Sequence, residues 1–245
     1  MSTDLFSGHA NLYAAFRPTY PEELYTFIFS HVTGRDFAWD CGTGNGQVAR
    51  RLAQDFNRVC ASDISVEQLE NATRHDRIEY LVSSAEKTSF PAGSFDLITV
   101  AQALHWFDTD LFYAEARRVA KKHAVIALWG YGHITINGQI DPLLGHFYSN
   151  VVGKYWDDAR RHVETEYRNI PFPFDEIQSP RFYIERDWTM AHLVGYLESW
   201  SATQKYIRET NVNPLRELEP GLKKYWGNAE TIRVRFPLFL RAGRI

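Results

Sequence analysis

Residues 37–46 combine one acidic residue and three glycines at a spacing that suits nucleotide binding. An apolar run ends in Asp40, Gly42, Gly44 and Gly46 follow at alternate positions, and a helix-like segment begins at once. A strand that passes through a glycine turn into a helix brings backbone close to a nucleotide. Glycine suits such a turn because it accepts positive φ and has no Cβ to block a ligand. The loop therefore predicts a nucleotide-like ligand.

The spacing D-x-G-x-G-x-G distinguishes between kinds of ligand. A dinucleotide loop reads G-x-G-x-x-G, and counted from Gly42 its third glycine would fall at Gln47. Counted from Gly44 it would fall at Ala49, where alanine is a permitted variant. The spacing weakens a dinucleotide site without excluding one. A P-loop would continue as Gly-Lys-Ser/Thr, and neither Lys nor Ser/Thr follows Gly46.

Two further polar positions follow the next two predicted strands. Asp63 ends the buried run 58–63, at 23 residues after Asp40. A carboxylate there can accept hydrogen bonds from both hydroxyls of a ribose. The turn 83–86 follows the apolar run 78–82, and a polar group with a backbone N–H there can meet the edge of an adenine.

These positions resemble the Rossmann-like, class I S-adenosylmethionine-dependent methyltransferases of the type 11 group. The matching residues are the 40–46 loop, Asp63, the 84–86 turn and the strand start at 95–98, over roughly the first 130 residues. The resemblance implies an enzyme with S-adenosylmethionine as cofactor. The sequence departs from the family at Ser84, where an Asp often holds the adenine amino group. The implied cofactor-binding residues are Tyr13, Arg17, Tyr20, Asp40, Gly42, Thr43, Gly44, Asp63, Ile64, Ser84, Ala85, Glu86 and Gln102.

Alternating strands and helices must position these residues. The order predicts an α/β fold with a doubly wound, mostly parallel seven-stranded sheet, and the resemblance implies an inserted helical lid. Ligands bind such sheets outside the carboxyl ends of the strands, where the strand order reverses. The polar positions above all follow predicted strand ends. The predicted strands are 36–41, 58–62, 78–82, 95–101 and 123–129, and the predicted helices start at Pro21 or span 46–55, 65–74 and 108–120.

The second half of the chain has a different pattern. Residues 1–135 are expected to be the cofactor-binding half with an N-terminal cap, and residues 136–245 the C-terminal half of the same domain. Pro237 suggests that the last strand is irregular or lies at an edge. By resemblance, residues 190–227 are expected to form a lid over the substrate. The expected elements are a helical region at 140–168, a strand at 181–188, two lid helices that break at 211–214 and a last strand at 233–241.

Composition narrows the class of protein. A chain of 245 residues with 44% hydrophobic content can bury a full core, and a net charge of −3 disfavours a broad nucleic-acid surface. Cys41 and Cys60 are expected to be buried thiols, without a disulfide or metal site. No apolar run reaches the length of a membrane span, and no leader pattern opens the chain. We therefore expect a cytoplasmic monomer or homodimer with no membrane partner.

Methyl transfer needs alignment and a dry site more than a covalent nucleophile. His105 is the catalytic candidate, because it could take a proton from an alcohol, although a histidine beside aromatic residues is more often structural. The phrase His-Trp-Phe at 105–107 resembles a group that includes trans-aconitate methyltransferase. The candidate substrate-binding residues are His105, Trp106, Trp129, Trp200, Tyr206 and Arg208, several of which could equally be packing residues.

A small-molecule acceptor, for example a carboxylate, fits these patterns best. Carboxylate oxygens are already anionic at neutral pH, so no general base is required. Methylation of RNA or protein would require a basic groove that the charge balance does not suggest. A cofactor-binding partner protein without activity is a third hypothesis. A dehydrogenase would leave Asp40 and the 84–86 turn without a role.

Overall fold

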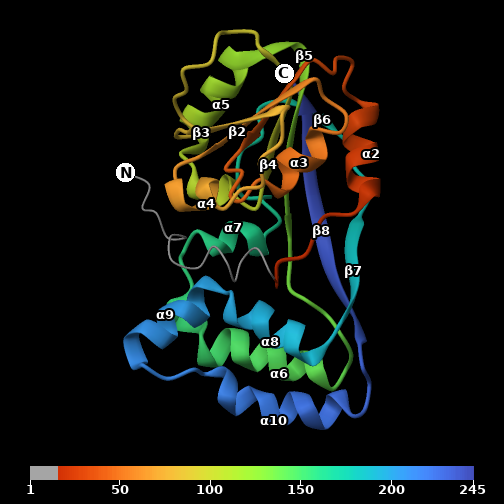
Figure 1. Cartoon of the computed structure of the whole chain (residues 1–245), viewed down its shortest axis with the longest axis vertical. Helices are drawn as coiled ribbons and strands as arrows, with labels where there is room; N and C mark the ends of the chain where they lie inside the picture. The colour runs from red at the N-terminus through yellow and green to blue at the C-terminus, as the bar shows by residue number, and fades with distance from the viewer. Residues whose placement is uncertain (1–15) are drawn as a thin grey trace.

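The computed structural model describes residues 16–245, and an eight-stranded sheet forms its centre. The strand order is β3-β2-β1-β4-β5-β8-β6, and β7 also pairs with β8 (Figure 1). The strands are β1 (Phe37–Cys41), β2 (Arg58–Asp63), β3 (Ile78–Val82), β4 (Phe95–Ala101), β5 (Ala120–Tyr131), β6 (Asp175–Ile177), β7 (Phe182–Trp188) and β8 (Ile232–Arg244). The predicted α/β class is confirmed, with one strand more than expected.

Short helices connect the strands and form a separate group beyond the sheet. The α-helices are α2 (Glu22–Ser30), α3 (Gln47–Leu52), α4 (Val66–Glu70), α5 (Thr109–Val119), α6 (Ile140–His146), α7 (Arg160–Glu164), α8 (Met190–Glu198), α9 (Ser201–Thr210) and α10 (Leu215–Trp226). The short helical turns are η1 (Leu104–Trp106), η2 (Phe147–Val151) and η3 (Gly153–Tyr155).

The first five strands are parallel, and their order creates the ligand-binding edge. β1 pairs with β2 on one side and with β4 on the other, so the direction of winding reverses between β1 and β4. β4 is buried along nearly its whole length, as expected for a parallel strand with both faces covered. The loops that follow β1 and β4 therefore face each other across the crevice where such folds bind ligands.

The last strand differs from the sequence prediction. β8 is neither short nor at an edge: it runs from Ile232 to Arg244 and pairs antiparallel with β5, β6 and β7. Pro237 is tolerated because the partner changes there. The β5 ladder ends at Leu238, and Pro237 only accepts a hydrogen bond from Gly132 through its carbonyl (2.8 Å). In an antiparallel strand, the N–H and the carbonyl of one residue point to the same side. The N–H that proline lacks would therefore point toward the chain that continues from β5, just past the last residue pair of the ladder.

The helical cap, by which we mean residues 140–164 and 190–226, lies below the sheet in Figure 1. The lid region predicted as two helices contains three, because the chain is extended at Trp200 between α8 and α9. The predicted break at 211–214 is present, and Asn211 ends α9 with a left-handed φ of 57°. None of the helices within residues 16–245 combines the length and apolarity needed to cross a membrane.

Candidate active site

A cavity of about 560 Å³ opens at the carboxyl ends of β1, β2 and β4. The loops after these strands form one wall, and a segment of the cap forms another. Most of the residues predicted to bind the cofactor line this cavity. They are Tyr20, Asp40, Gly42, Thr43, Gly44, Asp63, Ile64, Ala85, Glu86 and Gln102.

The glycine loop needs glycine for both its conformation and its packing. Gly42, Gly44 and Gly46 have φ values of 67°, 56° and 80°. A Cβ on Gly42 would lie 2.6 Å from the Cβ of Ala103, so the loop approaches the β4 loop too closely for a side chain. The N–H groups of Gly42 and Thr43 donate to the carbonyl of Ser62 at 2.9 and 3.0 Å, which ties the loop to β2.

Asp40 anchors the loop from within. Its carboxylate accepts hydrogen bonds from the hydroxyls of Thr43 and Thr99 at 2.5 and 2.8 Å, and from the N–H of Ala49 in α3 at 3.1 Å. Only 1% of its surface is exposed, and burial raises its pKa to about 6. Asp40 therefore fixes the strand, the loop and the helix start relative to one another.

Asp63 is positioned at the end of β2 by two backbone donors. Its Oδ2 accepts a hydrogen bond from the N–H of Gly44 at 2.8 Å, and its Oδ1 accepts one from the N–H of Ser65 at 3.0 Å. Asp63 lines the cavity, and a carboxylate oxygen can accept more than one hydrogen bond. Ribose hydroxyls are the donors that the sequence predicts for this position.

The turn that the sequence predicts to bind adenine differs from the prediction by one residue in which side chains line the cavity. Ser83, Ala85 and Glu86 line the cavity, whereas Ser84 does not. The Ser84 hydroxyl points to the carbonyl of Lys87 at 3.5 Å. The sequence pattern could not distinguish two adjacent serines, because which of them faces inward depends on the twist of the chain after β3.

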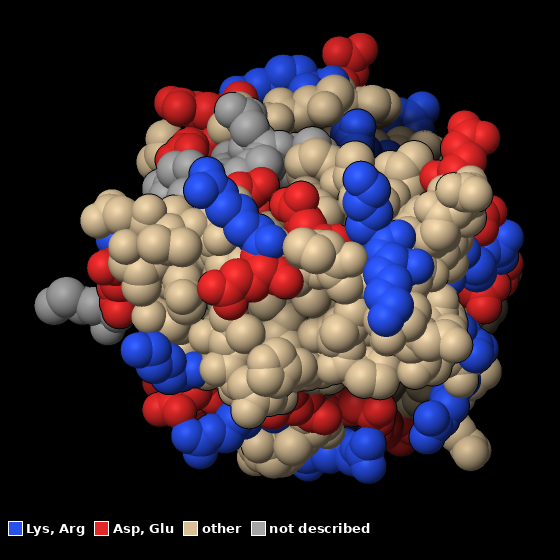
Figure 2. All heavy atoms as spheres, turned by 90° about the horizontal axis from the view of Figure 1, so that it is seen from below, with Lys and Arg blue, Asp and Glu red and all other residues tan. Residues whose placement is uncertain are grey.

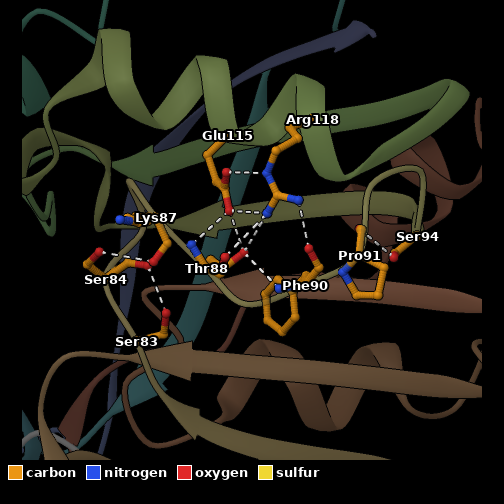
Figure 3. A network of polar contacts seen from close by, with 9 residues as sticks. All are labelled: Ser83, Ser84, Lys87, Thr88, Phe90, Pro91, Ser94, Glu115 and Arg118. Atoms are coloured by element: carbon orange, nitrogen blue, oxygen red, sulfur yellow. Dashed lines mark hydrogen bonds and ion pairs between the residues drawn. The ribbon is translucent and has the colours of Figure 1, made fainter.

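An ion pair on α5 holds the segment that carries this turn (Figure 3). The carboxylate of Glu115 accepts hydrogen bonds from the N–H and hydroxyl of Thr88 and from the guanidinium of Arg118. Arg118 also donates to the carbonyl of Phe90 at 2.8 Å. Because Glu115 is buried to all but 7% of its surface, this network fixes the segment after β3 to α5.

We expect Glu115 to make the protein sensitive to acid. The hydrogen bonds from Arg118 and Thr88 lower the pKa of Glu115 to about 2, below that of a free glutamate. Their contribution is therefore complete above about pH 4.5 and is lost as the pH falls toward 2. Glu115→Gln should lower the free energy of unfolding at pH 7 by roughly 1–3 kcal/mol and flatten its acid dependence. Urea unfolding between pH 2 and 7 measures this.

Glu219→Gln is the matched control, because Glu219 is exposed on α10. It should leave both the stability at pH 7 and the acid dependence unchanged. If the free energy of unfolding fell equally steeply with decreasing pH in the Glu115 variant and in the unaltered protein, Glu115 would not be the cause of the acid sensitivity.

Two cavity-lining glutamines show that the cavity suits a ligand with hydrogen-bond donors. The Oε1 atoms of Gln68 and Gln102 are shielded from solvent and have no hydrogen-bond partner within residues 16–245. Gln102 has a left-handed φ of 56°, and its amide nitrogen donates to the carbonyl of Tyr131 at 3.3 Å. Buried acceptors normally find a donor, and the ammonium and hydroxyl groups of S-adenosylmethionine supply such donors. The residues present therefore fit this cofactor.

Comparison with known proteins agrees with the geometry. A family model described as a methyltransferase domain matches residues 39–128. A Dictyostelium discoideum protein assigned to the methyltransferases is 36% identical, over 97% of this chain and 93% of its own length. The chain belongs to the S-adenosylmethionine-dependent methyltransferases.

Similar methyltransferases include one of known structure. A structure from Anaeromyxobacter dehalogenans assigned to the type II methyltransferases is 42% identical, with a TM-score of 0.87 over 94% of this chain and 98% of that one. A methyltransferase of Aspergillus candidus is 26% identical over 94% of this chain and 82% of its own length. The similarity to the solved structure extends through the cap, because it covers nearly the whole chain.

The N-terminal residues of this methyltransferase connect the cavity to the cap. Tyr20 lines the cavity, and its ring packs edge-on against Trp129 at 5.5 Å between centroids. Arg17 does not line the cavity. Its guanidinium donates to the hydroxyl of Tyr131 at 3.1 Å and to the carbonyl of Ser199 at 3.2 Å. Tyr13 lies outside the described residues.

Several residues predicted to bind the substrate lie away from the cavity. Trp106 lines it, but Trp129 is fully buried in the core. Trp200 is 5% exposed and packs against aromatic residues of the cap. Tyr206 packs against another tyrosine of the cap, and Arg208 is exposed on α9. The structure therefore supports an acceptor-binding role for Trp106 and gives the other four a packing or surface position.

His105 has the surroundings of a neutral, structurally fixed histidine. Its Nδ1 lies 3.0 Å from the hydroxyl of Tyr167, and His105 does not line the cavity. Burial, and next the positive charge of Arg160, lower its pKa to about 3. An imidazole with so low a pKa is a weak base, so these observations favour a positioning role for His105 over the catalytic role predicted from the sequence.

Sequence reasoning missed the contribution of the cap to the cavity. Asp157, Asp158 and Ala159, just before α7, form part of the wall. Lys205 of α9 holds this segment through an ion pair with Asp157 at 2.6 Å. No local motif marks these residues, because tertiary packing alone brings them to the cofactor loops. Within residues 16–245, no cluster of three or more His, Cys, Asp or Glu side chains is arranged to hold a metal ion.

Proposed function

We propose that this methyltransferase methylates a small organic molecule that binds between the β4 loop and the cap. The proposal rests on the residues that form the cavity wall. The cofactor loops form one part of this wall, and residues 157–159 of the cap form another. An acceptor that fits under such a wall is small. When bound, S-adenosylmethionine supplies a methyl group on a positively charged sulfur, and S-adenosylhomocysteine is the second product.

A carboxylate acceptor is compatible with a site at which the described residues offer no suitable general base. The acceptor oxygen must carry a lone pair toward the methyl carbon, and a carboxylate oxygen is anionic without losing a proton at the site. His105 is neutral and hydrogen-bonded to Tyr167, and it is therefore poorly suited to remove a proton. The work of the protein is to align the two ligands and to exclude water, with Trp106 on the wall of the cavity.

A nucleic acid acceptor is less well supported. Within residues 16–245, the charged side chains that line the cavity are all acidic: Asp40, Asp63, Glu86, Asp157 and Asp158. Figure 2 shows the face of the cap, where Lys and Arg are interspersed with Asp and Glu and separated by uncharged surface. Phosphate backbones are bound by clustered cations, and neither the cavity nor this face offers such a cluster.

Two measurements test the proposal. Unfolding in the presence of ligands tests the cofactor, and mass spectrometry of the products tests the acceptor. S-adenosylmethionine and S-adenosylhomocysteine at 100 times their Kd should each stabilise the protein by about 2.7 kcal/mol, and NAD should have no effect. Mass spectrometry should then detect methylated products from a panel of small organic acids. Methylation of RNA or protein, with no product from any small molecule, would disprove the proposed function.

A further inference from the structure

Arg160 is a partly buried cation in the cap that forms no ion pair with any residue within 16–245. It is the first residue of α7 and directly follows the segment that lines the cavity. Its Nε is shielded from solvent and has no hydrogen-bond partner within the described part of the chain. The two nearest acids along the chain form ion pairs with other cations: Asp157 pairs through Oδ1 with Lys205, and Asp158 pairs with Arg161. The Oδ2 atom of Asp157 is buried and has no hydrogen-bond partner within residues 16–245, and it forms no ion pair with Arg160.

The guanidinium of Arg160 is held in place by an aromatic ring. Its Cζ lies 5.0 Å from the ring centroid of Trp156, a stacking distance that favours a cation. The ring of Trp156 is fixed in turn, because its Nε1 donates to the carbonyl of Tyr148 at 3.2 Å and its ring packs against Trp200. A planar guanidinium held against a ring keeps its orientation, which prepares it for bidentate binding.

The groups around Arg160 do not neutralise it. Its charge acts on His105, Tyr148 and Tyr167, whose side chains are uncharged at neutral pH, because the pKa of His105 is lowered and those of the tyrosines are raised. Glu164, one turn further along α7, accepts a hydrogen bond from the hydroxyl of Tyr148 and forms no ion pair with Arg160. A partly desolvated cation that forms no ion pair with any of the described residues is stabilised by an incoming anion.

Arg160 also lies next to the cavity wall, directly after the wall residue Ala159. Helix α7 packs against η1, which follows β4. Trp106 in η1 lines the cavity, and its ring centroid lies 4.8 Å from that of His105. Ala159 lines the cavity from the cap side. Arg160 follows the wall residue Ala159 in the chain, and His105 precedes the wall residue Trp106. The contact between α7 and η1 brings these two pairs of residues together.

We propose that Arg160 binds an anionic oxygen group of the methyl acceptor, either a carboxylate or a phosphate. This inference rests on the proposed small-molecule function and adds the group that recognises the acceptor. The guanidinium offers two parallel N–H donors to two oxygens, and Trp156 fixes its plane. Among the described residues, the cofactor loops supply no cation to the cavity, since their charged lining side chains are Asp40, Asp63 and Glu86.

Binding of small acids to the protein saturated with S-adenosylhomocysteine tests the inference. Citrate and glycerol 3-phosphate are the probes, and isothermal titration calorimetry is the measurement. At least one of them should bind, and Arg160→Met should weaken that binding by about 10- to 100-fold, while Arg160→Lys should retain part of it. Affinity for S-adenosylhomocysteine should change less than about twofold, because Arg160 does not line the cavity.

Arg216→Met is the matched control, because Arg216 is an exposed arginine of the cap on α10. It should bind both probes as the unaltered protein does. Binding of two further probes, the ester trimethyl citrate and the diamine putrescine, is measured on the unaltered protein. These measurements test the inference even if Arg160→Met does not fold. Binding of neither acid, or binding of the ester or the diamine as tightly as citrate, would overturn the inference.

The outcomes separate this inference from the proposed function. Methylated products from uncharged small molecules, together with no acid binding, would overturn the role of Arg160 and leave the proposed function standing. Methylation of macromolecules alone would overturn both. If citrate binds but glycerol 3-phosphate does not, the anionic group is a carboxylate, and the reverse result identifies a phosphate.

Discussion

Replacing Asp63 with alanine should weaken S-adenosylmethionine binding by about 100-fold and leave the fold intact. The carboxylate faces the cavity and also holds the N–H of Gly44 at 2.8 Å. The substitution therefore removes a ribose acceptor and releases part of the glycine loop. Calorimetric titration with S-adenosylmethionine measures the affinity, and thermal unfolding without ligand measures the fold.

Asp76→Ala is the control for this experiment, because it removes the same charge from an exposed position. Its affinity for the cofactor should equal that of the unaltered protein. Asp63→Asn keeps one acceptor oxygen and should give an intermediate loss. Equal cofactor affinity in Asp63→Ala and the unaltered protein would show that the ribose is bound elsewhere.

Replacing Gly42 with alanine should damage both the fold and the cofactor site. A left-handed φ costs an alanine about 1–2 kcal/mol, and the new Cβ would lie 2.6 Å from the Cβ of Ala103. A Cβ atom moves only with its backbone, so the two loops must separate. We expect a loss of about 2–4 kcal/mol in unfolding free energy and at least about a tenfold loss of cofactor affinity. Urea unfolding and calorimetric titration measure the two effects.

Gly93→Ala separates the two causes. Gly93 has a φ of 65°, close to that of Gly42, but a Cβ there would meet no atom within 4 Å. The control therefore contains the backbone strain without the steric contact. It should lose about 1–2 kcal/mol of stability and keep full cofactor affinity. If Gly42→Ala and Gly93→Ala bound the cofactor equally well, the close approach of the loops after β1 and β4 would not contribute to cofactor affinity.

The cofactor half could be predicted from the sequence because its signals are local. Asp40, the glycine loop and Asp63 each stand at a strand end, and strand ends follow from short apolar runs. Parallel pairing then brings these residues to one edge of the sheet without further information. The shift from Ser84 to Ser83 shows the limit of this reasoning, since the side of the chain that faces inward is set by the twist after β3.

The acceptor half could not be predicted as well because its positions depend on tertiary packing. Arg160 gave no signal in the sequence, since its surroundings come from η1, η2 and α7 together. Trp129 was assigned to the pocket by its place at the end of a strand, but Tyr20 and Tyr25 cover it in the core. The break between α8 and α9 lacks a glycine or proline, which is why the region looked like one helix.

In the proposed function, the wall segment Asp157–Ala159 links cofactor and acceptor binding. It borders the cavity, pairs with Lys205 of α9, and leads directly into Arg160. We expect each ligand, by contacting this segment, to change the affinity of the protein for the other ligand. By thermodynamic reciprocity, S-adenosylmethionine must then change the affinity for the acceptor by the same factor as the acceptor changes the affinity for S-adenosylmethionine. The proposal thus assigns any cooperativity between the two substrates to one short stretch of chain.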